Sequence, residues 1–93
     1  MLFRSVEVYE RIGEAWAAAA VRPTRGHLAV LLEGVRLFPR HAALVLRAAE
    51  LHLEHGYAEE AEALLAAAER VAEDPATRDR VGALRARLPA PRD

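Results

Sequence analysis

Two histidines, His52 and His55, come closest in type and spacing to a metal site. They are three residues apart, so on a helix both imidazoles could reach one metal ion, with Glu59 as a third ligand. However, His52 also falls on an apolar stripe of its segment, and His55 lies next to Gly56 at the segment's end, where a histidine suits a helix C-terminus. We therefore expect structural roles for both histidines. A metal-dependent enzyme using His52 and His55 is a remote alternative.

Other groups that perform catalysis are scarce. The chain has no cysteine, lysine, asparagine or glutamine, and its small hydroxyls are Ser5, Thr24 and Thr77. It also lacks the glycine-rich phosphate-binding motif G-x-x-x-x-G-K-[ST]. Few groups therefore remain to act as nucleophile, base or oxyanion donor. We predict that the protein is not an enzyme and that it carries no cofactor and no metal.

The charges are unevenly spread along the 93 residues, which hold 13 arginines, 14 acidic residues and a net charge of −1. Residues 42–75 carry a net charge of −6, and residues 76–93 carry +3. Because Asp79 and apolar positions interrupt the basic segment, this pattern indicates internal charge complementarity rather than a nucleic-acid surface. No apolar run reaches the roughly 18 to 20 residues that a membrane span needs, and the N-terminus lacks a signal-peptide core. We predict a cytoplasmic protein that binds neither nucleic acid nor membrane.

The composition and the spacing of helix-breaking residues predict an all-α fold. Alanine, leucine, glutamate and arginine dominate, and all of them favour helix. Prolines and glycines at intervals divide the chain into about five segments. The predicted helices lie near residues 3–20, 26–37, 41–55, 58–72 and 76–88.

The third and fourth predicted helices form a hairpin around Gly56, a residue suited to the left-handed position after a helix end. One apolar stripe consists of Leu44, Val45, Ala48, Leu51 and His52, and the facing one of Ala61, Leu64, Leu65, Ala68 and Val71. A connection this short makes the two helices antiparallel.

The same pattern occurs twice. Tyr9, Ile12, Gly13 and Trp16 each precede Val45, Ala48, Ala49 and His52 by 36 residues, as Pro39 precedes Pro75. In the second helices, Leu31 and Gly34 precede Leu65 and Ala68 by 34 residues. Tyr9-x2-Ile12-Gly13-x2-Trp16 resembles the tetratricopeptide-repeat signature W-x2-L-G-x2-Y with the aromatics exchanged. Ala61-x3-Leu65 and the prolines are similar to its later part, so the resemblance covers about residues 6–75.

This resemblance implies a single domain, 1–93, in which antiparallel hairpins stack as a short α-solenoid. The hairpins would span 6–41 and 42–75, followed by a capping helix at 76–88 and a tail at 89–93. The first helix of each hairpin in this family lines a concave groove that receives peptides or partner helices. The matching positions here predict a partner-binding groove formed by Glu7, Glu10, Glu14, Leu46, Arg47, Glu50, Leu53 and Glu54.

The resemblance therefore predicts a non-enzymatic protein-interaction module, a scaffold or adaptor. Glu10 and Glu14 stand where carboxylate-clamp members of the family carry lysine and asparagine, so a peptide C-terminus would be repelled. A basic or amphipathic segment suits the acidic floor better.

Three alternatives stay open. In the first alternative, the chain is a homo-oligomerisation module, for instance a homodimer that covers Leu2, Phe3, Val6 or Val8. An exposed apolar end face tends to bind a partner. In the second alternative, the chain is a fragment of a longer repeat protein, since two hairpins are fewer than the three or more repeats usual for stability. In the third, the glutamates are ordinary solvated residues on a groove that binds nothing in isolation.

Overall fold

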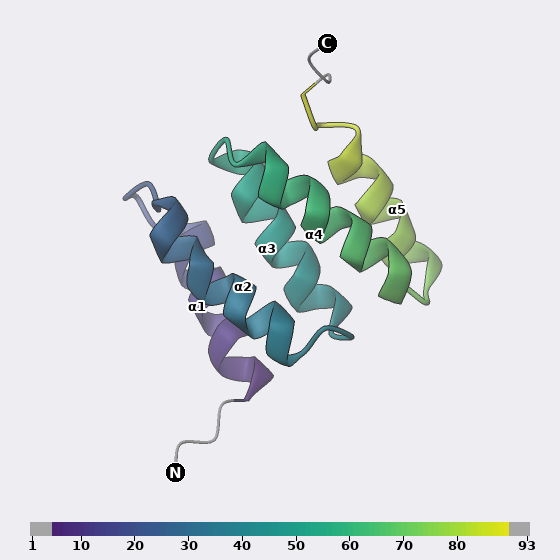
Figure 1. Cartoon of the computed structure of the whole chain (residues 1–93), viewed down its shortest axis with the longest axis horizontal. Helices are drawn as coiled ribbons and strands as arrows, with labels where there is room; N and C mark the ends of the chain where they lie inside the picture. The colour runs from purple at the N-terminus through teal and green to yellow at the C-terminus, as the bar shows by residue number, and fades with distance from the viewer. Residues whose placement is uncertain (1–4, 90–93) are drawn as a thin grey trace.

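The computed structural model describes residues 5–89, which form five α-helices and no strand. The helices are α1 (Val6–Ala18), α2 (Arg25–Leu37), α3 (Ala42–Glu54), α4 (Ala58–Val71) and α5 (Pro75–Arg85). They succeed one another along an array with principal extents of 47 × 32 × 22 Å, in which α1 passes behind α2 at one end and α5 lies at the other (Figure 1). The predicted all-α class is confirmed.

The predicted helices all exist, and the largest differences in length are at the first and last. α1 ends at Ala18 instead of residue 20, and Ala19 is already extended, ahead of the turn that leads to Pro23. α5 ends at Arg85 instead of residue 88. Its last turn tightens, since the backbone N–H of Arg87 donates to Leu84 and that of Leu88 to Arg85. The predicted residues 3 and 4 lie outside the described part of the chain.

Side chains cap three of the five helix starts. Thr24 accepts from the backbone N–H of His27 while the His27 ring accepts from that of Thr24, which is a reciprocal capping box. The His41 ring accepts from the N–H of Leu44, and the Asp74 carboxylate accepts from that of Thr77. Gly56 has a φ of +86°, the left-handed conformation that ends α3 as the sequence predicted.

Helix α3 is the centre of the core. It packs against α1, α2, α4 and α5, whereas α2 and α4 meet only where Arg25, at the start of α2, pairs with Glu60 of α4. All five residues of its predicted apolar stripe are buried, including His52, and so are Leu46 and Ala49. The second hairpin therefore packs through its first helix, α3, onto both helices of the first hairpin, and the single helix α5 packs in the same way onto α3 and α4.

The first hairpin is held by aromatic packing across α1 and α2. Tyr9 is buried against Gly34, where an added Cβ would lie 2.6 Å from the Tyr9 ring. The Trp16 ring stacks on His27, with centroids 4.8 Å apart. Gly34 therefore sets the separation of the two helices, since no larger residue leaves room for the tyrosine.

Two glycine substitutions are expected to change stability in opposite directions. Gly34→Ala should lower the free energy of unfolding by about 1–3 kcal/mol, because the new methyl group overlaps the buried Tyr9 ring. Gly82→Ala should raise it by about 0.5–1 kcal/mol, because the site is exposed and helical, and the new Cβ meets nothing within 4 Å beyond its chain neighbours and the adjacent backbone of its own helix. Urea unfolding followed by circular dichroism measures both. A Gly34→Ala protein as stable as the parent would contradict the packing described here.

Candidate functional site

A groove of about 440 Å³ lies between α3 and α5. Its lining combines small apolar side chains with charged ones: Ala43, Leu46, Arg47, Glu50, Ala76, Thr77 and Arg80. Leu46 is largely buried and forms part of the hydrophobic core, so its exposed edge is rigidly held. The groove therefore offers a fixed apolar floor within a charged rim.

Glu50 joins the two sides of this groove. One carboxylate oxygen accepts from Arg47 at 3.0 Å, and the other accepts from Arg80 of α5. The Glu50 side chain is only 14% exposed, whereas those of Arg47 and Arg80 are 38% and 54% exposed. Both Glu50 oxygens are thus engaged within the chain, and the groove presents the outer parts of two guanidinium groups.

The glutamates of α1 form a separate acidic patch, Glu7, Glu10 and Glu14, which lines an open depression together with Arg11. Glu7 and Glu14 are exposed and Glu10 is half-buried. Within residues 5–89, no basic side chain forms an ion pair with any of the three. This patch therefore keeps its negative charge available.

Arg47 connects the acidic patch with the groove. Its side chain lies over Gly13 of α1, where an added Cβ would be 2.7 Å from the Arg47 Cγ. Glu10 lies one helical turn before Gly13 on the same side of α1. We call the exposed side of α1, α3 and α5 that includes the acidic patch and the groove the first-helix face.

The predicted site residues fall into three places. Glu7, Glu10 and Glu14 come together on α1, and Leu46, Arg47 and Glu50 line the groove. Leu53 packs against the core and Glu54 is exposed at the end of α3, and neither lines the groove or the depression on α1.

The contribution of α5 to the groove, Ala76, Thr77 and Arg80, was not predicted. The sequence feature that could have indicated this contribution is the net positive charge of residues 76–93, which follow the acidic segment 42–75.

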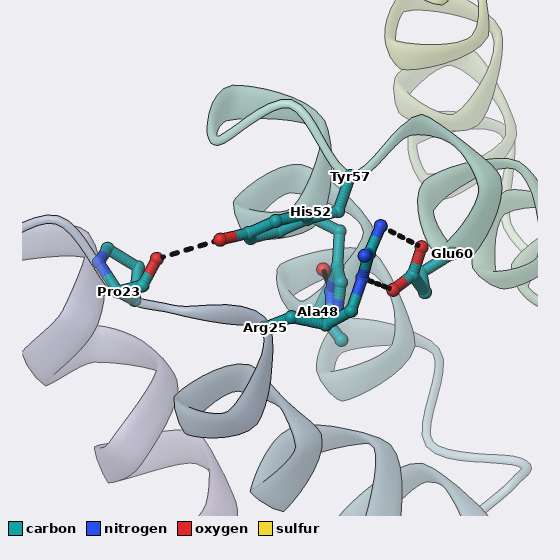
Figure 2. A network of polar contacts seen from close by, with 6 residues as sticks. All are labelled: Pro23, Arg25, Ala48, His52, Tyr57 and Glu60. Carbon is teal, nitrogen blue, oxygen red and sulfur yellow. Dashed lines mark hydrogen bonds and ion pairs between the residues drawn. The ribbon is translucent and has the colours of Figure 1, made fainter.

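A second cluster joins the two hairpins at their loops. The Tyr57 hydroxyl donates to the Pro23 carbonyl at 3.3 Å, and the Arg25 guanidinium lies 4.8 Å from the centroid of the Tyr57 ring (Figure 2). Arg25 also donates to both carboxylate oxygens of Glu60. These contacts connect the α1–α2 loop and the first residue of α2 to the start of α4, and we call them the hairpin seam.

His52 lies beneath this seam and His55 at the end of α3. The His52 Nδ1–H donates to the Ala48 carbonyl at 2.7 Å, and the His52 and Tyr57 rings lie at 68° to each other with centroids 6.1 Å apart (Figure 2). Its Nε2 is buried without a hydrogen-bond partner. His55 is the cap residue that directly follows α3. In the described part of the chain, no group of three histidine, aspartate or glutamate side chains is placed to hold a metal ion.

Compared with protein-family models, curated proteins and solved structures, the chain matches none of them. No described helix is both long and apolar enough to cross a bilayer. The cytoplasmic location stays a prediction.

Acid should weaken the hairpin seam. Hydrogen bonds from Arg25 hold the pKa of the Glu60 carboxyl below its usual range. Because the folded pKa lies below the unfolded one, of about 4.3, the stabilisation is complete above that value. It is lost as the pH falls through the lowered pKa. Thermal unfolding between pH 7 and pH 2.5 should therefore show a falling Tm, and Glu60→Gln should reduce the fall.

The matched control is Glu62→Gln, an exposed position on the same helix. It should leave the acid dependence of the parent unchanged. Equal dependence in the parent and the Glu60→Gln protein would show that the Arg25–Glu60 pair contributes nothing to stability.

Proposed function

We propose that this chain is a non-enzymatic protein-interaction module that binds a peptide or helix along the first-helix face. The observation that carries the proposal is the groove between α3 and α5, with its apolar floor and charged rim, next to the acidic patch of α1. A rigid apolar position surrounded by charged groups is the usual composition of a peptide-binding surface.

We further propose that the five helices form a short tetratricopeptide-like array. Two features support this assignment. The second hairpin, through α3, and the last helix α5 each pack onto both helices of the preceding unit, as stacked repeats do. Of the residues matched to the signature, Tyr9, Gly13, Ala61 and Leu65 are buried and Ile12 and Trp16 are half-buried, and Gly34 admits the tyrosine.

The lining of the groove favours binding over catalysis. Its polar groups are Arg47, Glu50 and Arg80, which are paired with one another, and Thr77, whose hydroxyl donates to Asp74. Neither His52 nor His55 lines it. The Thr77–Asp74 contact belongs to the cap of α5, and Asp74 does not line the groove. The groove lining itself therefore holds no nucleophile paired with a base, which acyl or phosphoryl transfer requires.

Selection from a random peptide display library against the purified chain tests the proposal. We expect enriched peptides that bind with micromolar dissociation constants, measured by fluorescence anisotropy. The double substitution Glu10→Arg with Glu14→Arg should change those constants at least tenfold, because it reverses the charge of the acidic patch. Glu62→Arg, on the exposed side of α4, is the matched control and should change them little. Failure to enrich any peptide would overturn the proposal. So would equal binding of the peptides to the parent and to the protein with Glu10→Arg and Glu14→Arg.

Self-association is the second candidate function. Large apolar side chains are exposed on α1, the α1–α2 loop and α2, namely Val8, Val21, Val30 and Leu37. Val30 and Leu37 are seven residues apart and so share one side of α2. Leu2 and Phe3, which the sequence suggested for this contact, lie outside the described residues.

Light scattering after size exclusion separates the two candidates. A monomer from micromolar to millimolar concentration is the result expected of an interaction module with an open face. A dimer that dissociates on dilution, with a Tm that falls in parallel, would favour the oligomerisation module instead.

A further inference from the structure

The first-helix face has opposite charge at its two ends. On α1, three glutamates and Arg11 give a local charge of −2. In the α3–α5 groove, Arg47 and Arg80 outnumber Glu50 and leave +1. A partner of uniform charge is therefore attracted at one end of the face and repelled at the other.

The positive end has unused hydrogen-bond donors. A guanidinium has five N–H donors, and Arg47 and Arg80 each use one of them in a hydrogen bond to Glu50. The side chains of Arg47 and Arg80 are 38% and 54% exposed, whereas that of Glu50 is only 14% exposed. A carboxylate that enters the groove can thus be bound by both arginines without displacing Glu50, and such charge-assisted bonds are the strong ones.

The distance between the two ends sets the length of the partner. Packed helices have axes about 8–10 Å apart, so α1 and α5, on either side of α3, are separated by roughly 16–20 Å. An extended chain covers about 3.3 Å per residue, so it crosses that distance in about five or six residues. Leu46, between Ala43 and Ala76, supplies an apolar contact on the way.

We propose that the partner is an extended peptide of mixed charge, whose basic residues contact the acidic patch of α1 and whose acidic side chain binds between Arg47 and Arg80. An apolar side chain between them packs on Leu46. This inference rests on the proposed function, because it names the partner of the same face. It refines the basic or amphipathic segment that the sequence predicted by adding an acidic end, since Glu50 is already neutralised by two arginines.

Four fluorescent peptides test the inference by anisotropy at fixed ionic strength. The parent peptide has three arginines, a five-residue spacer with a central leucine, and three aspartates. In the second the aspartates become serines, in the third the arginines become serines, and in the fourth the aspartates become arginines. The parent peptide should bind at least tenfold more tightly than each of the others. Equal binding of the first two peptides would overturn the inference.

Substitutions in the groove assign the acidic end. Arg80→Glu should weaken the parent peptide at least fivefold and strengthen the peptide with arginines at both ends, which a loss of folding alone cannot do. Arg80→Gln should weaken the parent peptide with less disturbance of the helix. Glu50→Gln should preserve or increase its affinity, because a competing carboxylate is removed. Arg36→Glu, exposed on α2, is the matched control and should leave all four affinities unchanged.

The two proposals fail in different ways. In one outcome, the peptide with serines in place of the aspartates binds as tightly as the parent peptide, and the Glu10→Arg, Glu14→Arg protein binds neither of them. The proposal of an interaction module then stands, and the proposal of a mixed-charge partner is wrong. If none of the four peptides binds, the mixed-charge partner is also wrong, and the display selection then decides the proposed function independently.

Discussion

The burial of α3 is the constraint on which the rest of this structure depends. It is the one helix that touches all four others, and seven of its thirteen residues are buried. Ala48 and Ala49 have small side chains, so the backbones of neighbouring helices approach α3 closely. Without the contacts of α3 to the first hairpin, each hairpin would expose an apolar side. This is the reason why repeat units are stable only when stacked.

The charges of the first-helix face follow from that burial. A helix surrounded on most sides has little surface left for polar residues, so Arg47 and Glu50 lie where α1 and α5 approach α3. A carboxylate that is mostly covered needs partners for both of its oxygens. Glu50 obtains them from its own helix and from α5, and the pairing leaves guanidinium groups, not carboxylates, at the surface of the groove.

The hairpin seam and the first-helix face use different residues. Tyr57, Arg25 and Glu60 join loop and helix starts, whereas the face is built from the bodies of α1, α3 and α5. Acid acts on the seam through Glu60, and charge substitutions on the face act on binding. Orientation of the hairpins and recognition of a partner are therefore open to separate measurement. His52 belongs to the packing beneath the seam, with one ring nitrogen bonded to Ala48 and the other enclosed.

The sequence by itself determined the helices, their approximate ends and the residues they bury. Helical periodicity placed Leu44, Val45 and His52 on one side of α3, and Gly56 marked its end, because both signals depend only on neighbouring residues. It also placed Glu10 and Glu14 on one side of α1. Only the tertiary structure decided which distant charges meet. Glu50 and Arg80 are 30 residues apart and Arg25 and Glu60 are 35 apart. Their pairing depends on the angles at which the helices pack, and those angles are set by the fit of side chains such as Tyr9 against Gly34, which periodicity does not encode.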